Sequence, residues 1–350
     1  MTKSARSHYY SVTRKMLLLA GQWPFQERRT KLFGVSLLTI INISFLMPQI
    51  KDLTEYLYSD WEKLKDTEEY EIMETHAMKA RLLSLIYCIY IYIASIMFVS
   101  VSLIPHIVNN MLPVNESWPI FMPYESDYCV DGEEYFFYIF SHAFVGILII
   151  ITGLIGHDCV IMTYIEHVCS VFAVAEFRFK TMVRDTHDVT MVNNLDKKYN
   201  RKIAISVHAH WRALRFAELL EETFCIGLGM QIMITTIAIS VTLLQVAKAN
   251  LFAETARNAA FVLGQIIHLF IISLQGQKLM DYSTQIGDNI YSSSWYKMPV
   301  KSQRMLLFAM RRSLQPNFLS AGKIYIFSLK SFTTVVQTSV SYFTVLASFQ

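Results

Sequence analysis

The chain has 350 residues, of which 53% are hydrophobic and 17% charged, and its mean hydropathy is +0.33. Soluble domains carry about 25% charged residues, so this composition excludes an ordinary soluble protein. The net charge of +3 is small, and the chain has no polybasic tract of the kind that binds nucleic acid.

Six segments are long and apolar enough to cross a bilayer. Crossing requires about 20 mainly apolar residues in a helix, because lipid offers the backbone no hydrogen-bonding partner. The six windows are residues 32–50, 82–104, 135–157, 223–247, 258–277 and 331–350, with residues 324–329 extending the last one backwards across Lys330. This pattern predicts an all-α membrane protein.

The distribution of basic residues predicts the orientation of these spans. Residues 106–134 contain no Lys or Arg but several acids, and they hold the sequon Asn115-Glu116-Ser117, so we expect them outside with Asn115 glycosylated. Basic residues crowd 158–222 and recur in 278–323, which places both segments in the cytoplasm. The C-terminal helix therefore runs from inside to outside.

The first crossings do not fit this orientation. The basic residues of 1–31 predict a cytoplasmic N-terminus, and the span over 82–104 must begin in the cytoplasm. Two cytoplasmic segments need an even number of crossings between them, but only the window 32–50 is present. Residues 51–81 are too densely charged to supply another. Either the first window is re-entrant, the N-terminus lies outside, or one span is missing.

The predicted organisation follows these boundaries. It comprises a cytoplasmic N-terminus (1–31), a first transmembrane helix (32–50), a charged cytoplasmic segment (51–81), two spans joined by the acidic loop (82–157), cytoplasmic helices (158–222), two further spans (223–277), a second cytoplasmic region (278–323) and a C-terminal helix (324–350).

The chain shows no pattern typical of an enzyme or a metal site. Its five cysteines form no CxxC pair, and His208 and His210 point to different faces of a helix. No set of nucleophile, base and orienting residue is visible, so we expect no enzyme activity, cofactor or metal. His268 lies within a span, where we expect a neutral, hydrogen-bonded histidine.

Motifs in the last third of the chain resemble the signature region of insect odorant receptors. The motifs are Gln275-Gly276-Gln277, Ile290 to Tyr296, Pro316, Ala321-Gly322-Lys323, and the polar helix from Phe327 to Leu346. Upstream, Gly156-His157-Asp158, Glu221-Glu222-Thr223-Phe224 and Gln231 also resemble the family. The resemblance covers most of residues 55–350.

The resemblance implies a seven-helix subunit with a cytoplasmic N-terminus and an extracellular C-terminus. Such subunits form tetrameric, non-selective cation channels in the plasma membrane of olfactory sensory neurons, where an odour-tuning subunit joins a co-receptor and volatile organic ligands open the pore. The second helix is absent by this comparison, in agreement with the count of crossings. A truncated, non-functional isoform is therefore an alternative. Lys330 also departs from the acidic or neutral residue common in relatives.

The C-terminal helix has the pattern of a pore-lining segment. Gln337, Ser341, Thr344 and Ser348 follow a spacing of three or four residues, so they share one face. Such a face can line water, although Ser and Thr also join packed helices in membranes. By resemblance, Val345 occupies the hydrophobic gate and Phe349 lies one turn outward.

The resemblance also places a ligand pocket in the outer membrane half, among helices two, three, four and six. The candidate ligand-binding residues are Tyr90, Ala94, Met97, Ser141, Phe144, Phe261 and Gln265. Aromatic core packing is the alternative at each position. The resemblance further implies a cytoplasmic anchor between subunits, built from 163–184, 198–222 and 301–312.

Two other classes of membrane protein remain as alternatives. A G-protein-coupled receptor is disfavoured by the basic N-terminus and by the lack of an NPxxY pattern in the last helix. A secondary transporter is disfavoured because the chain shows no repeated half and no paired broken helices.

Overall fold

The computed structural model describes residues 48–64, 66–105, 134–184, 195–248 and 252–348. The chain divides into two compact units, residues 1–59 and 60–350. In the first unit, the described residues 48–59 are helical. The second unit contains the elements that follow.

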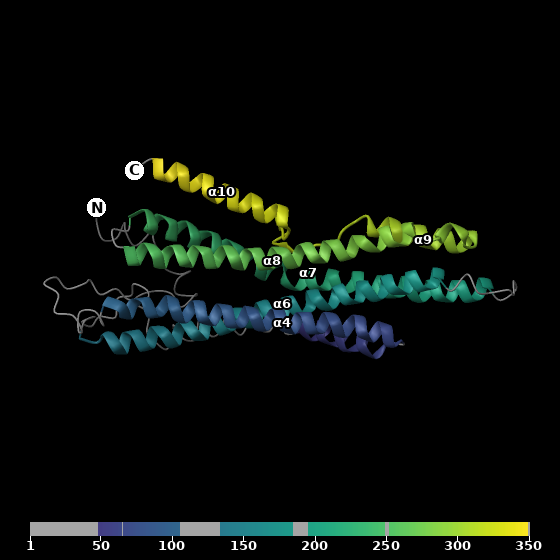
Figure 1. Cartoon of the computed structure of the whole chain (residues 1–350), viewed down its shortest axis with the longest axis horizontal. Coiled ribbons are helices and arrows are strands. Elements are labelled where there is room, and N and C mark those ends of the chain that lie inside the picture. The colour runs from purple at the N-terminus through teal and green to yellow at the C-terminus, as the bar shows by residue number, and fades with distance from the viewer. Residues whose placement is uncertain (1–47, 65, 106–133, 185–194, 249–251, 349–350) are drawn as a thin grey trace, which may run out of the picture. The chain divides into compact units, whose positions relative to one another are not determined.

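Four long helices build the second unit (Figure 1). They are α4 (Thr67–Ser100), α6 (Phe136–Arg184), α7 (Leu195–Lys248) and α8 (Phe252–Ser292). Helix α6 packs against α4, α7 and α8, and α7 packs against α8. A short 3-10 turn, η1 (Val101–Leu103), follows α4, and another, η3 (Trp295–Lys297), precedes α9 (Val300–Ser313), which packs on α8 and α7.

Each of the four long helices contains a stretch that is long and apolar enough to span a membrane. The predicted windows 82–104, 135–157, 223–247 and 258–277 lie on these helices, apart from a few residues outside the described part of the chain. The last window lies mainly on α10 (Leu329–Ser348). The window 32–50 lies almost wholly outside the described residues, so the predicted missing crossing remains a prediction.

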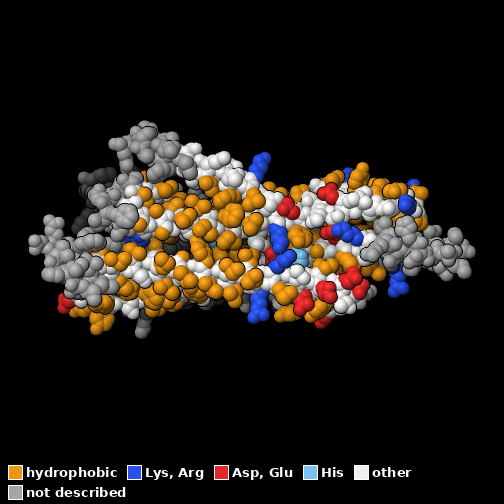
Figure 2. Space-filling model, in the orientation of Figure 1, with side chains coloured by type: hydrophobic (Ala, Val, Ile, Leu, Met, Phe, Trp, Pro, Cys, Tyr) orange, Lys and Arg blue, Asp and Glu red, His pale blue; other side chains and the backbone are white. Residues whose placement is uncertain are grey.

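The predicted segment boundaries at 81/82, 157/158, 222/223 and 277/278 fall inside continuous helices rather than at helix ends. The sequence prediction ended each span at the first charged or polar residues. The helices continue because many of these residues pair with one another in the bundle. Figure 2 shows hydrophobic side chains covering one half of the visible face, and charged side chains gathered on the other.

Three buried carboxylates connect the helices in this charged half. Glu69 of α4 accepts two hydrogen bonds from Arg178 of α6, each 2.7 Å long. Asp60 accepts a 2.6 Å bond from Nε of Arg212, and its other oxygen lies 3.2 Å from Nε2 of His167.

Glu166 of α6 is the third carboxylate. It pairs with Lys278 of α8 and lies 3.2 Å from Nδ1 of His76 on α4. Buried carboxylates without such partners would be strongly destabilising. These pairs therefore allow the long helices to carry charged residues into the packed part of the bundle.

A small hairpin turns the chain back towards the apolar half. Strands β1 (Ser320–Ala321) and β2 (Tyr325–Ile326) pair antiparallel, and Gly322 between them has a φ of +58°. Its backbone N–H donates a 2.9 Å hydrogen bond to the carbonyl of Cys225 on α7. A Cβ atom at Gly229 would lie 3.0 Å from that same nitrogen, so a glycine on α7 lets the hairpin approach. Helix α10 follows the hairpin and packs on α8.

Candidate functional site

Helix α10 presents a polar face that the other described residues leave exposed. Thr334, Gln337, Thr338 and Ser341 are exposed. The hydroxyl of Thr338 donates to the carbonyl of Thr334 at 2.8 Å, and the hydroxyl of Ser341 donates to the carbonyl of Gln337 at 2.9 Å. The side of α10 towards α8 is aromatic, because Phe332 contacts Phe270 with ring centroids 5.3 Å apart.

The structure therefore places two of the predicted pore residues, Gln337 and Ser341, on an exposed face of α10. Thr344, Val345 and Ser348 belong to the same helix, but their side chains lie outside the described part, as does residue Phe349. Asn115 also lies outside the described residues. The gate and the glycan remain predictions.

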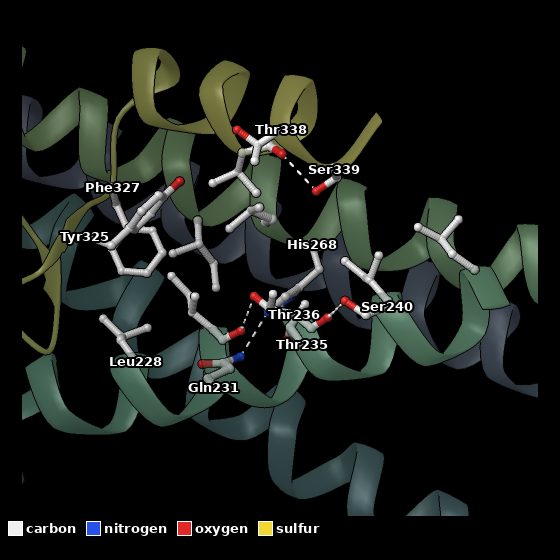
Figure 3. Close-up of a pocket in the computed structure, with 16 residues that line it drawn as sticks. Leu228, Gln231, Thr235, Thr236, Ser240, His268, Tyr325, Phe327, Thr338 and Ser339 are labelled. Atoms are coloured by element: carbon white, nitrogen blue, oxygen red, sulfur yellow. Dashed lines mark hydrogen bonds between the residues drawn. The ribbon is translucent and has the colours of Figure 1, made fainter. Parts of the chain in front are cut away.

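A cavity of about 210 Å³ lies between α7, α8 and α10. Figure 3 shows Gln231, Thr235 and Thr236 of α7 on one side, and Thr338 and Ser339 of α10 facing them. Tyr325 and Phe327, from the hairpin and the residues after it, close one end. The remaining lining residues are mainly apolar: Leu228, Ile232, Ile239, Ser240, Leu243, His268, Leu269, Ile272 and Val335. The cavity therefore adjoins the helix predicted to line a pore.

Tyr325 lines the cavity beside Phe327. Its oxygen is buried, while the aromatic ring contacts that of Phe327 at 5.3 Å between centroids.

A cluster of buried polar side chains from four helices borders the cavity. The hydroxyl of Tyr87 on α4 donates to Asp158 of α6 at 2.6 Å and lies 2.9 Å from Nδ1 of His268 on α8. The amide nitrogen of Gln231 on α7 lies 2.9 Å from Nε2 of His268 and 3.3 Å from Asp158. Tyr87 is 2% exposed and Asp158 1%, so water does not satisfy these groups.

The hydrogen bonds of His268 suit a neutral ring. Tyr87 uses its proton on Asp158, so Nδ1 of His268 must donate to the Tyr87 oxygen. The amide N–H of Gln231 then donates to Nε2, which is an acceptor only in neutral imidazole. The prediction that His268 is hydrogen-bonded is confirmed, and its neutral state stays a prediction.

The predicted ligand-binding residues lie elsewhere, and none of them lines this cavity. Ala94, Met97 and Ser141 are exposed, whereas Tyr90, Phe144, Phe261 and Gln265 are half-buried. Phe261 of α8 contacts Phe98 of α4 with ring centroids 6.0 Å apart, which is the aromatic packing considered as the alternative. These residues remain predictions as ligand contacts.

The predicted anchor segments form the charged half of the bundle, on α6, α7 and α9. A second cavity of about 590 Å³ lies there, bordered by Arg178, Arg201 and Arg212 together with Asp60 and Glu62. Arg178 and Arg212 already pair with Glu69 and Asp60.

The model of the 7tm odorant receptor family matches residues 32–340. The chain belongs to this odorant receptor family. It is similar to odorant receptor 13a of Drosophila melanogaster, with 24% identity over 60% of this chain and 52% of the relative. It is also similar to the odorant receptor coreceptor of Ooceraea biroi, with 23% identity over 44% of this chain and 33% of that protein. The chain thus spans about half or less of these curated relatives.

Solved structures agree with the family at the level of the fold. The insect olfactory receptor OR5 from Machilis hrabei, in complex with eugenol, matches with a TM-score of 0.59 and 10% identity, over 100% of both chains. A second structure of OR5 from the same species matches with a TM-score of 0.55 and 13% identity, over 99% of both chains. The chain is therefore an all-α, multi-pass membrane protein of a receptor family, which favours a receptor over the transporter and enzyme alternatives.

Neither the cavity nor the polar cluster was predicted from the sequence. Asp158 and Gln231 already belonged to the motifs that resemble the family, and a carboxylate directly after one apolar window and an amide inside another were signals. The partner on α4, Tyr87, carried no such signal, because a tyrosine among apolar residues is also typical of core packing.

Proposed function

We propose that this chain is an odour-detecting subunit of a ligand-gated, non-selective cation channel. In this proposal it joins a co-receptor subunit in a tetramer, in the plasma membrane of olfactory sensory neurons. Small volatile organic molecules open the pore, and α10 from each subunit lines it. Family membership and the helical fold support the proposal.

The exposed polar face of α10 is the observation that carries the proposal. The hydroxyl groups of Thr338 and Ser341 donate hydrogen bonds to backbone carbonyls of the helix. The exposed side-chain amide of Gln337 instead needs water or another protein as its hydrogen-bonding partner. Exposing such an amide to hydrocarbon costs several kcal/mol, roughly 4–8 on a cyclohexane scale. A water-filled pore between subunits removes that cost, because it hydrates the whole face.

The defective isoform is the second candidate function. The defective isoform is supported by the number of apolar windows near the N-terminus. Only one window, 32–50, separates residues 1–31 from residues 51–81, and the charged residues of both segments predict a cytoplasmic location. A chain without its second helix would retain α10 and lack part of the bundle around the predicted ligand residues.

Cysteine accessibility on α10 tests the channel proposal. The full chain is expressed with a co-receptor, currents are evoked by a broad panel of volatiles, and a cationic methanethiosulfonate is applied. We expect the reagent to block current through Gln337→Cys and Ser341→Cys. Ser339→Cys is the matched control, because Ser339 is half-buried and faces the cavity between helices.

Two results would count against the channel proposal. Equal block at all three positions would remove the assignment of the polar face to the pore. The absence of current with every volatile would favour the defective isoform, provided that grafting a second span after Ile50 restores current.

A further inference from the structure

Two free cysteines face each other between α4 and α6. The sulfur atoms of Cys88 and Cys159 lie 3.6 Å apart, which is a hydrogen-bonding contact between thiols. Both side chains are half-buried, whereas the other free cysteines of the described residues, Cys169 and Cys225, are buried. A disulfide bond is ~2.0 Å long, so the two sulfurs would need to approach by about 1.6 Å, a movement that both side chains share.

Neighbouring contacts hold this stretch of α4 and α6 in register. The residues directly before the two cysteines, Tyr87 and Asp158, are joined by the 2.6 Å hydrogen bond of the polar cluster. Further along the seam, the hydroxyl of Tyr92 lies 2.9 Å from that of Thr152. The two helices lie side by side (Figure 1). The folded chain therefore keeps the two thiols together, although 71 positions separate them in the sequence.

The predicted orientation places this pair of thiols near the cytoplasmic end of two spans. The apolar window on α4 begins at residue 82, and the window on α6 ends at residue 157. The cytosol keeps thiols reduced, and the disulfides that do form in cytosolic proteins are usually transient and catalytic or redox-sensing. Two half-buried thiols in contact suit a pair that stays reduced until a small oxidant reaches it.

We propose that Cys88 and Cys159 are a redox modification site, at which hydrogen peroxide joins α4 to α6 through a disulfide bond. One cysteine attacks the peroxide as a thiolate and becomes a sulfenic acid, Cys–SOH, and one water molecule is released. The second sulfur then attacks the sulfenic sulfur, so that the S–S bond forms, the S–O bond breaks and a second water molecule leaves. The two thiols together lose two electrons and two protons, and one peroxide becomes two water molecules.

The disulfide would tie α4 to α6 directly beside the polar cluster that joins the four long helices. The residues before the two sulfurs belong to that cluster, so the bond would restrict any movement of α4 along α6 at this point. The inference goes beyond the proposed receptor function and does not depend on it.

Peptide mass spectrometry tests the inference without requiring any current. The full chain in lipid nanodiscs is exposed to hydrogen peroxide and then denatured, the remaining thiols are alkylated, and the peptides are analysed without reduction. We expect a cross-linked pair of peptides that contains Cys88 and Cys159 and that dithiothreitol separates. Cys169 and Cys225, which are buried, should be recovered as alkylated thiols.

The matched control moves one thiol by a single position. Cys159→Ser combined with Val160→Cys keeps the number of thiols, but it turns one of them by about 100° around α6, to a residue that is 36% exposed. We expect no cross-link to Cys88 in this variant. In at least one of the single variants Cys88→Ser and Cys159→Ser, dimedone should label the remaining thiol, because its sulfenic acid then has no second sulfur beside it.

Three results would overturn the inference. The first is recovery of both Cys88 and Cys159 as free thiols under conditions in which dimedone labels a single variant. The second is their conversion to sulfinic acids without a disulfide. The third is cross-linking of Cys88 to the thiol at position 160 as efficiently as to Cys159, because proximity along the seam would then not select the partner.

Discussion

The amide nitrogen of Gln231 lies 2.9 Å from Nε2 of His268, and both side chains also line the cavity beside α10. Through His268 and Asp158 this contact continues to Tyr87, so one polar cluster joins α4, α6, α7 and α8. A ligand in the cavity would contact two members of that cluster on one side and α10 on the other. The cluster is thus placed to connect ligand occupancy with the packing of the four long helices.

Tyr87→Phe removes the hydroxyl at the centre of this cluster. It leaves an oxygen of Asp158 and a nitrogen of His268 buried without their partner, which should lower the free energy of unfolding by about 1–3 kcal/mol. Thermal unfolding of the purified chain in detergent measures the change. Tyr92→Phe is the control, because its hydroxyl contacts Thr152 at an exposed position, and we expect a far smaller shift. Equal shifts in the unfolding temperature of Tyr87→Phe and Tyr92→Phe would show that the buried hydrogen bonds of Tyr87 add no stability beyond that of an exposed one.

Arg178→Met tests the buried ion pair between α4 and α6. Glu69 is 6% exposed and would lose a bidentate partner, and the expected loss is about 3–5 kcal/mol of stability. Adding Glu69→Leu should restore much of the loss, because the buried carboxylate is then absent as well. Lys180→Met removes an exposed pair with Glu176 and should cost under ~0.5 kcal/mol. Thermal unfolding measures the three variants, and a double variant as unstable as Arg178→Met would contradict this expectation.

The long helices and the polar face of α10 could be predicted from the sequence, because uncharged windows and a three-to-four residue period are local properties. The helix ends could not be predicted in the same way. Asp158 and Glu166 follow an apolar window and were interpreted as the start of a cytoplasmic segment. Their partners, Tyr87 and Lys278, lie about 70 and 110 residues away, and only the folded bundle brings them together.

The cavity was unpredictable for a related reason. Its walls come from α7, α8, the hairpin and α10, and no single segment carries the pattern of a pocket. Thr236 and Ser240 have the same spacing as hydroxyls that bond the helix backbone in any membrane helix. That they line a cavity became evident only when the opposing wall was known. The predicted ligand residues on α4, α6 and α8 were inferred from the family instead, and they stay predictions.

Gly276→Ala should disrupt the junction between α8 and α10. A Cβ atom at this position would lie 2.6 Å from Cβ of Phe327, and also against the Phe327 carbonyl, so the connection into α10 must shift. Elsewhere in a helix the same change is favourable by up to about 1 kcal/mol. Gly153→Ala is therefore the matched control, because nothing lies within 4 Å of a Cβ there. We expect lower thermal stability and reduced ligand-evoked current for Gly276→Ala, and unchanged or higher stability for Gly153→Ala.

Lys330 provides a prediction about ion conduction. It is exposed on the first turn of α10, just before the polar face, so the proposed pore would carry its positive charge near one end. A cation entering there is repelled, and Lys330→Gln should raise single-channel cation conductance at low salt. The difference should shrink at about 1 M salt, where the screening length falls to ~3 Å. Lys330→Arg, which keeps the charge, and Lys323→Gln, which removes an exposed charge from the hairpin, should leave conductance unchanged. A conductance that responds to Lys323→Gln and not to Lys330→Gln would place the ion path away from the start of α10.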